Sequence, residues 1–331
     1  MPTNLPPEYY EVEKQYKAAT DAVEKATLLE ELLSTIPKHK GTDHLRANLR
    51  RKLSKLKTAA RSKKSTSRQV SVYNISKEGA GQVVVIGPAN VGKSSLVDKL
   101  TNASPEVSEA PFTTWQPTPG MMPIRNIQVQ LIDTPPLNPE YVEADMFNLL
   151  RKADLLLLMV DLETDPVQQL EDSLALLRAQ RIIPQHMADE YSEGGLRRYF
   201  FKPCLVLANK CDDEYDFELY EIFRQLLEGD CPMMPVSVKS GRNLKKMKKT
   251  IYQRLGIIRV YSKAPGQEPD LNSPFVMPKG STVAEFARKV HQDFYENLKA
   301  ARIWGQSAAF EGQMVSRDHE LQDGDVIELS I

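Results

Sequence analysis

The chain has 331 residues, 41% of them hydrophobic and 26% charged, which are the proportions of an ordinary globular protein with room for two or three domains. A formal net charge of −1 argues against a partner selected by overall charge, and three cysteines without zinc-ligand spacing argue against a disulfide framework or a zinc site. Because the chain starts without a secretory signal pattern and no apolar run is long enough to cross a bilayer, we expect a cytoplasmic protein that does not enter membranes.

Two helices are predicted in the N-terminal region, residues 1–78. Residues 7 to about 36 repeat leucine at steps of three and four, and Pro37 and Gly41 end this helix. The second helix, residues 45–56, has one leucine stripe and is otherwise basic. Because residues 46–77 contain no Asp or Glu, the basic arm, residues 46–68, can serve as an electrostatic footprint for nucleic acid or an anionic membrane, and contact with nucleic-acid phosphates is the leading interpretation. The alternative is a solvated helix face followed by a linker.

A parallel sheet covered by helices on both faces is predicted for residues 79–256. Apolar runs of strand length recur there and alternate with amphipathic stretches of helical period, a pattern typical of an α/β fold. The predicted strands are Val83–Ile86, Val129–Ile132, Leu155–Val160, Cys204–Leu207 and Met233–Val236.

The pattern changes again in residues 257–331, which predict a small α+β module with a β-grasp-like arrangement. One helix, Thr282–Leu298, has Val283, Phe286, Val290 and Phe294 on one face. Glycines mark the turns between the short segments. The predicted strands of this module are Ile258–Tyr261, Phe275–Met277, Ala301–Trp304 and Val326–Leu329.

A phosphate-binding loop is predicted where the first strand ends. Gly87-x-x-x-x-Gly92-Lys93-Ser94 follows Val83–Ile86 and precedes a segment of helical period, which is the context that a P-loop requires. The glycines and the helix N-terminus would surround the phosphates, and Lys93 would contact the β- and γ-phosphates. A chance glycine-rich turn is the alternative. The residues assigned to phosphate binding are Gly87, Asn90, Val91, Gly92, Lys93, Ser94 and Ser95.

Guanine is the base that the next motif favours. Asn209-Lys210-Cys211-Asp212 follows the strand Cys204–Leu207, and the Asp212 carboxylate can accept hydrogen bonds from N1–H and the exocyclic amine, which adenine does not offer. Asn209 would contact the other edge of the base, and the Lys210 stem would lie along the ring. Ser237-Val238-Lys239 fits the last base-contacting loop, with the Val238 N–H reaching the guanine carbonyl and Lys239 covering the ring.

Magnesium ligands are predicted from three hydroxyl or carboxylate groups. The Ser94 hydroxyl would bind Mg²⁺ directly, and Asp133, at the end of the strand Val129–Ile132, would hold a Mg²⁺-bound water. Thr114, in the Pro-rich segment that contains Phe112-Thr113-Thr114, is the candidate for the second hydroxyl ligand, with Thr113 as the alternative. The alternative is that these are loop threonines present for their β propensity, and we favour the functional interpretation.

Together these motifs resemble the Obg–developmentally regulated GTP-binding protein family of translation-factor-class GTPases. The phrase Ile36-Pro-Lys-His-Lys-Gly-Thr42 and the basic helix after it resemble that family's N-terminal region. Residues 257–331, with Lys263-Ala-Pro-Gly-Gln, Ile303-Trp304-Gly305 and Asp318-His319-x-Leu321-x-Asp323-Gly-Asp325, look like a TGS domain. The resemblance implies a GTPase that acts on ribosomes.

Three residues bear on hydrolysis once this resemblance is accepted. Asn90 matches the asparagine that helps to coordinate K⁺ in GTPases without an arginine finger, although an Asn also tolerates a left-handed backbone. Leu137 stands where many GTPases have a water-orienting Gln, so slow intrinsic hydrolysis that a partner accelerates is expected, and Asn90 implies that potassium stimulates it. Pro136 replaces the Gly of D-x-x-G and has no N–H for the γ-phosphate. Catalytic roles are assigned to Lys93, Asn90 and Thr114.

Two functions of different classes remain. The first is a GTP-hydrolysing molecular switch that contacts the ribosome or its RNA through residues 46–68 and the TGS-like module. The second is a regulatory module that binds GTP, barely hydrolyses it and recruits a protein partner; Pro136 and Leu137 favour this alternative.

Overall fold

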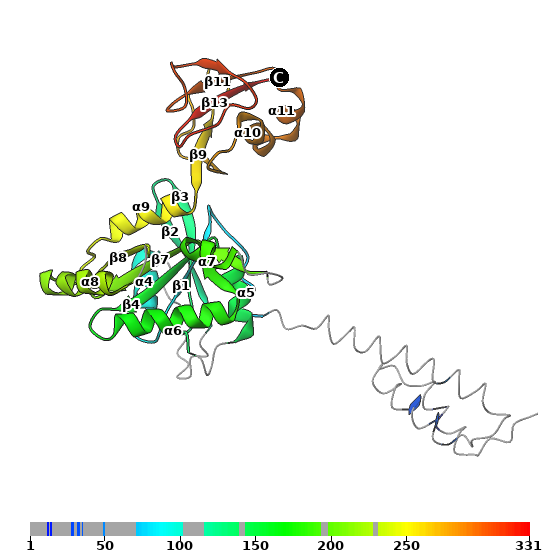
Figure 1. Cartoon of the computed structure of the whole chain (residues 1–331). Coiled ribbons are helices and arrows are strands. Elements are labelled where there is room, and N and C mark those ends of the chain that lie inside the picture. The colour runs from blue at the N-terminus through cyan, green and yellow to red at the C-terminus, as the bar shows by residue number, and fades with distance from the viewer. Residues whose placement is uncertain are drawn as a thin grey trace, which may run out of the picture. The chain divides into compact units, whose positions relative to one another are not determined.

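The computed structural model describes residues 71–101, 116–138, 143–192, 198–227 and 231–331, together with isolated positions among the first 70 residues. The chain divides into two compact units, Met1–Ser71 and Val72–Ile331 (Figure 1). In the first unit, Leu29, Leu32 and Leu49 are helical and buried, as the predicted leucine stripes require. The rest of the basic arm, residues 46–68, lies outside the described residues.

A central sheet of six described strands organises the second unit, in the order β2-β3-β1-β4-β7-β8. Neighbouring strands run parallel except for β2, which pairs antiparallel with β3. The strands are β1 (Gln82–Ile86), β2 (Thr118–Ile124), β3 (Ile127–Asp133), β4 (Leu155–Asp161), β7 (Cys204–Asn209) and β8 (Met233–Pro235). The five strands predicted from the sequence are confirmed; β2 was missed.

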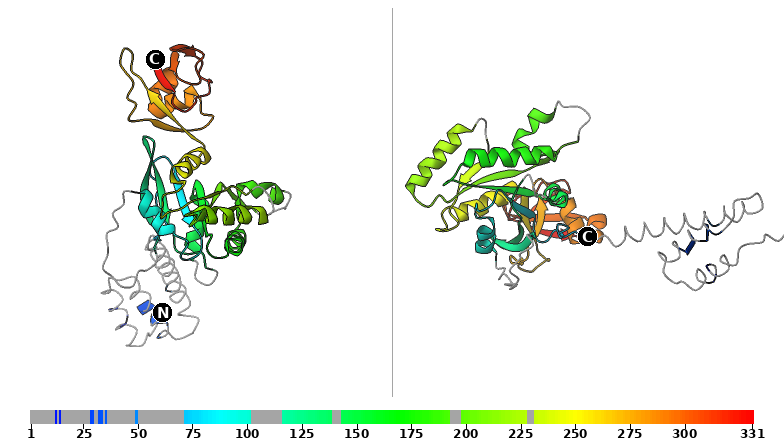
Figure 2. Two further views of the ribbon diagram at one scale, coloured as in Figure 1. Left: turned by 90° about the vertical axis from the view of Figure 1, so that its left-hand side faces the viewer. Right: turned by 90° about the horizontal axis from the view of Figure 1, so that it is seen from below.

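Helices cover both faces of this sheet (Figures 1 and 2). The helices are α4 (Lys93–Leu100), α5 (Ala144–Lys152), α6 (Pro166–Ala179), α8 (Glu214–Leu226) and α9 (Leu244–Arg254). Successive residues of β4 alternate between two buried clusters: Leu156 packs with side chains of α5, α6 and α8, and Leu157 packs with side chains of α4 and α9. Every residue of β4 is buried, which explains why it reads as a continuous apolar run.

The missed strand β2 has the sequence Thr-Pro-Gly-Met-Met-Pro-Ile. Pro119 and Pro123 argue against a strand because proline cannot donate to a ladder. The structure resolves the conflict by placing β2 at the edge of the sheet, beside β3 only. Gly120, within β2, lies against Thr101, where a Cβ would be 2.7 Å from the Thr101 hydroxyl oxygen.

The described residues between α6 and β7 form four short elements: β5 (Ile182–Pro184), a 3₁₀ turn at Gln185–Met187, α7 (Ala188–Ser192) and β6 (Phe200–Lys202). Strands β5 and β6 form a separate parallel pair. Among the described residues no helix is both long and apolar enough to pass through a membrane.

The C-terminal module has a five-stranded mixed sheet in the order β10-β9-β13-β11-β12. Its strands are β9 (Ile257–Ser262), β10 (Phe275–Pro278), β11 (Ala300–Trp304), β12 (Gln313–Val315) and β13 (Val326–Ser330). The single helix predicted over Thr282–Leu298 is wrong, because the structure has two helices, α10 (Val283–Val290) and α11 (Gln292–Asn297). His291 is fully extended (φ −165°, ψ 150°) and its ring accepts a hydrogen bond from the Asp293 N–H, so it ends one helix and begins the next.

Asp323 is the centre of a polar cluster that links this module to the large sheet within the second unit. Its carboxylate accepts hydrogen bonds from Tyr252 of α9, from the Arg259 backbone and guanidinium of β9, and from Arg125 in the β2–β3 turn. Burial raises the pKa of Asp323, but the hydrogen bonds from Arg259 and Tyr252 outweigh it and hold that pKa well below its usual range. Asn126 adds hydrogen bonds to Tyr261 and Arg259.

Candidate functional site

The P-loop lies between β1 and α4, at the carboxyl edge of the sheet, and two of its glycines are required by close contacts. Gly87 (φ 144°) is so near β4 that a Cβ would lie 2.3 Å from the Met159 carbonyl oxygen. Gly92 (φ 96°) would place a Cβ 2.5 Å from the Asn209 side-chain nitrogen. Both positions therefore exclude other residues on backbone conformation and on space.

Lys93 begins α4 and is buried, with 6% of its surface exposed. Its ammonium donates to the carbonyl oxygens of Gly87 (3.0 Å) and Pro88 (2.6 Å). Burial lowers the pKa of Lys93 to about 8, while the nearby Asp133 carboxylate opposes this shift. The loop thus holds a poorly solvated cation at the helix N-terminus, an arrangement that favours anion binding.

Asp133, at the end of β3, lies against the first turn of α4. The Ser94 hydroxyl donates to Asp133 Oδ2 at 2.6 Å, whereas Asp133 Oδ1 is buried without a hydrogen-bond partner among the described residues. Burial raises the pKa of Asp133, and the Ser94 hydrogen bond and Lys93 partly offset that effect. A hydroxyl beside an unsatisfied buried carboxylate oxygen fits Mg²⁺, which prefers oxygen ligands and normally shares them with phosphates and water.

Ser94 and Asp133 alone supply too few oxygen ligands to complete the coordination of Mg²⁺. The described residues contain no group of three or more His, Cys, Asp or Glu side chains placed to hold a metal. Thr113 and Thr114, the candidates for the second hydroxyl ligand, lie outside the described residues.

Asn209, the last residue of β7, joins two loops through its buried carboxamide. Its Nδ2 donates to the Val91 carbonyl of the P-loop at 2.8 Å, and its Oδ1 accepts from the Val238 N–H at 3.1 Å. The Asn209 carboxamide and the Val238 N–H were both predicted to contact guanine, and in the structure they are hydrogen-bonded to each other. Asn209 positions the Ser237–Lys239 loop against the P-loop.

Asp212 follows two residues after Lys210 and faces the same loop. The Ser237 hydroxyl donates to Asp212 Oδ1, and Lys239 Nζ lies 3.4 Å from Asp212 Oδ2. The Ser237 hydrogen bond is the largest of the effects that lower the pKa of Asp212. Asp212 is consequently an ionised acceptor, which is the state needed to receive two N–H donors.

The Lys210 ammonium is held by two acids at the end of β4. It lies 2.7 Å from Asp161 Oδ2 and 2.8 Å from Glu163 Oε2, and hydrogen bonds from Lys210 to these two carboxylates raise its pKa. Lys210 also has a left-handed backbone (φ 66°). Its charge is therefore fixed at the rim of the site.

A cavity of about 550 Å³ brings these motifs together. Eight of its lining residues were predicted from the sequence, namely Asn90, Gly92, Ser95, Asn209, Lys210, Asp212, Val238 and Lys239. Lys99 and Glu163 also line it, and sequence reasoning missed both because neither belongs to a motif.

Lys99 attaches α4 to the Ser237–Lys239 loop. Its ammonium donates to the carbonyl oxygens of Val238 and, at 2.9 Å, Lys239. The Val238 backbone is thereby held on both sides of its Cα, at its N–H by Asn209 and at its carbonyl by Lys99.

The segment after β3 is anchored to the P-loop side of the sheet. Thr134 Oγ1 donates to the Val85 carbonyl at 2.6 Å, and the Leu137 N–H donates to the Gly87 carbonyl at 3.0 Å. Leu137 is 7% exposed and packs in the core with α5 and α6. Asn90 has φ 64°, a conformation that Asn tolerates well, and is exposed at the cavity.

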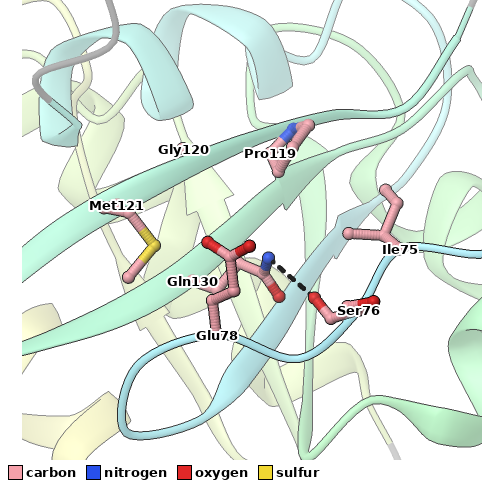
Figure 3. A pocket seen from close by; sticks show the side chains of 7 residues that line it. All are labelled: Ile75, Ser76, Glu78, Pro119, Gly120, Met121 and Gln130. Atoms are coloured by element: carbon pink, nitrogen blue, oxygen red, sulfur yellow. Dashed lines mark hydrogen bonds between the residues drawn. The ribbon is translucent and has the colours of Figure 1, made fainter.

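A second cavity, of about 510 Å³, lies at the β2 edge of the sheet and contains none of the motif residues (Figure 3). In it the Gln130 amide donates to the Ser76 carbonyl at 3.1 Å. Gln130 also accepts a buried hydrogen bond from Gln82, so this pair attaches residues 72–79 to the sheet.

Comparisons with known proteins agree with this architecture. The family described as "50S ribosome-binding GTPase" matches residues 82–188, and the TGS domain matches residues 258–331. An uncharacterized GTP-binding protein of Methanocaldococcus jannaschii is 30% identical, across 93% of this chain and 92% of its own. Developmentally-regulated G-protein 2 of Arabidopsis thaliana is 26% identical, across 93% and 90%. Human developmentally-regulated GTP-binding protein 2 is 22% identical, across 93% and 98%.

A P-loop on a parallel sheet, beside an Asn-Lys-x-Asp loop at the same edge, defines a P-loop GTPase, here with a C-terminal TGS domain. The relatives extend over nearly the whole chain. The chain belongs to the Obg–developmentally regulated GTP-binding protein family, and the resemblance seen in its motifs is confirmed.

We predict that Lys99→Met speeds GDP release. Hydrogen bonds to a charged group contribute about 1.5–3 kcal/mol, and a loss of about 1.4 kcal/mol corresponds to a tenfold change, so dissociation of a fluorescent GDP analogue, measured by stopped flow, should be about tenfold faster or more. Lys152→Met, at the exposed end of α5, is the matched control and should release GDP at the wild-type rate. Equal rates for Lys99→Met and wild type would show that the loop is held without Lys99.

We also predict that nucleotide affinity falls as the pH rises through about 8. The pKa of Lys93 is about 8 in the free protein, and bound phosphates would raise it, so binding requires proton uptake above that pH and none well below it. Calorimetry in buffers of different ionisation enthalpy measures this uptake directly. In Lys93→Arg, whose cation does not titrate, affinity should be lower but independent of pH over this range; the same proton uptake in both proteins would contradict the assignment.

Proposed function

We propose that this protein is a GTP-hydrolysing molecular switch that acts on ribosomes or ribosomal RNA in translation or ribosome assembly. The observation that carries the proposal is the cavity in which Asp212, Lys239 and the P-loop residue Gly92 line one space. In this proposal residues 79–256 are the GTPase domain, residues 1–78 a basic helical region and residues 257–331 the TGS domain.

Guanine recognition is assigned to the Asn-Lys-x-Asp loop. Asp212 is ionised and would accept from N1–H and the exocyclic amine, which discriminates against adenine because that base would leave the carboxylate unpaired. The stems of Lys210 and Lys239 would cover the ring. Asn209 would position the loop through Val91 and Val238, and the second N–H of its amide would be the group that contacts the other edge of the base.

Phosphate and magnesium binding are assigned to the P-loop and the groups around it. Lys93 would leave the carbonyls of Gly87 and Pro88 for the β- and γ-phosphates, with backbone groups of residues 87–95 around them. Ser94, Asp133 and Thr114 would hold Mg²⁺, which supplies charge neutralisation to the phosphates when it is bound.

Hydrolysis is proposed to be slow and stimulated by potassium. Leu137 is buried in the core, and an aliphatic side chain cannot orient water in any case. Asn90, exposed at the cavity, is the proposed protein ligand for K⁺, which would supply positive charge that an arginine supplies in other GTPases. A partner that accelerates the reaction fits the same observations.

A ribosomal site of action is supported by the description of the matching family as a 50S ribosome-binding GTPase and by the TGS domain. The basic arm, residues 46–68, is proposed as one contact with RNA phosphates and the TGS domain as another. A cytoplasmic location is part of this proposal.

The alternative, a module that binds GTP, hydrolyses it poorly and recruits a protein partner, is favoured by Pro136 and Leu137. Single-turnover GTP hydrolysis in KCl and in NaCl, with and without ribosomes, separates the two functions. We expect a rate that is higher in KCl and rises further with ribosomes. Absence of hydrolysis under all four conditions would contradict the switch and favour the alternative.

Asp212→Asn should change the base preference from guanine to xanthine, because an amide donates to the xanthine carbonyl where a carboxylate repels it. GTP affinity should fall by at least about tenfold, the effect of losing one hydrogen bond to a charged group, while XTP affinity rises. Competition binding with both nucleotides measures the ratio. Asp213→Asn, at the neighbouring N-cap of α8, is the control; unchanged GTP selectivity in Asp212→Asn would refute its role.

A further inference from the structure

Helix α9 presents an unbalanced basic surface outside the nucleotide site. Its 11 residues, Leu-Lys-Lys-Met-Lys-Lys-Thr-Ile-Tyr-Gln-Arg, include five cations and no acid. One side of the helix is buried against the sheet through Leu244, Met247, Ile251 and Tyr252. Lys245, Lys246 and Lys249 are exposed, and these three residues are named here the α9 lysine face.

The positive charges of the α9 lysine face destabilise helix α9 itself. Lys245 and Lys246 occupy the first turn, where the helix dipole favours acids, and α9 has no acid there. Lys245 and Lys249 are four residues apart and Lys246 and Lys249 three apart, so like charges face one another. By contrast, α8 begins with Glu214 and Asp216 in its first turn. A solvated helix face needs no such excess of one charge.

Neighbouring acids do not neutralise the α9 lysine face. Glu214 pairs with Arg242, Asp212 with Lys239 and Asp323 with Arg259, and no ion pair joins Lys245, Lys246 or Lys249 to another described residue. Lys248 is different, because it is half-buried and donates to the Pro123 carbonyl at 3.1 Å. The three exposed ammonium groups are left for an external anion.

The second unit is also polarised in charge. Helix α8, with four acids and one arginine among its 13 residues, packs on one face of the sheet, and α9 packs on the other. A polyanion is therefore repelled from the α8 face and attracted to the α9 face.

We propose that the α9 lysine face is an RNA-binding surface that contacts the phosphate backbone. The inference rests on the proposed ribosomal function and adds to it a contact within the GTPase domain. Lysines act on phosphates as point charges, and the three lysines are not interleaved with exposed aromatic residues on α9 that could stack on bases. The surface binds structured RNA without reading its sequence.

The test is the salt dependence of binding by the full-length protein. A labelled mixed-sequence RNA hairpin and intact ribosomal subunits are each titrated over a range of KCl concentrations with wild type and with Lys245→Gln/Lys246→Gln/Lys249→Gln. Gln has nearly the helix propensity of Lys and removes the repulsion, so the thermal midpoint of the variant should be unchanged or higher. The slope of log affinity against log salt should decrease by about 2–3 for three lost phosphate contacts, and affinity should fall on the order of tenfold or more.

Two control variants are measured beside the glutamine variant. Lys152→Gln/Arg178→Gln/Arg224→Gln removes the same charge from exposed positions on α5, α6 and α8 and should bind RNA with the wild-type slope. Lys245→Arg/Lys246→Arg/Lys249→Arg keeps the charge and should retain binding.

Three results would overturn the inference. If wild type binds ribosomes and the glutamine variant has the same slope, the proposed function stands and the lysine face is a solvated surface. If the variant loses ribosome binding but keeps hairpin binding, the face contacts an acidic protein instead. If wild type binds neither the hairpin nor the subunits, the proposed function falls together with the inference.

Discussion

The side-chain amide of Asn209 spans the distance between the P-loop and the Ser237–Lys239 loop, donating to the Val91 carbonyl and accepting from the Val238 N–H. It is 4% exposed, and a buried amide that lost either partner would incur about 1–3 kcal/mol. Gly92 has no side chain because Asn209 occupies the space where a Cβ would lie. Asn209 therefore holds the P-loop and the base-contacting loop in place relative to each other. Lys99 attaches α4 to the Ser237–Lys239 loop as well.

Asn209 can reach both loops because of the direction and order of the strands in the sheet. β1, β4 and β7 are parallel and fully buried, so their carboxyl ends share one edge, and the residues that follow them meet there. Asp161 pairs in register with Asn209 across β4 and β7, which is why Asp161 can hold the side chain of the next residue, Lys210. Side chains nearly 50 residues apart in sequence become neighbours through strand register alone.

The elements that could be predicted from the sequence are those in which a single physical requirement determines the residue types. Buried strands such as β4 were predictable because both faces are covered, and the P-loop because phosphate binding demands particular residues at fixed spacing. Where two constraints compete, the prediction was wrong or incomplete. Strand β2 was missed because its prolines argue against a strand, and they are tolerated here only because β2 lies at the sheet edge. The apolar period across residues 282–298 predicted one helix although the extended His291 divides it into two. Lys99 and Glu163 were unpredictable, since their partners are backbone or side-chain groups brought together only by folding.

The Gly87 carbonyl connects the P-loop to the segment that follows β3. In this structure it accepts from both the Lys93 ammonium and the Leu137 N–H. Pro136 has no N–H, so the first backbone donor after Thr134 and the two prolines belongs to Leu137, and it is directed at the P-loop and not at a phosphate. If bound phosphates drew Lys93 away, Leu137 would remain as a partner of that carbonyl. Since the Leu137 side chain is also in the core, two contacts hold this segment in place, the backbone hydrogen bond to Gly87 and the packing of Leu137 beside α5 and α6, so the position of the segment is set by the P-loop and the core together.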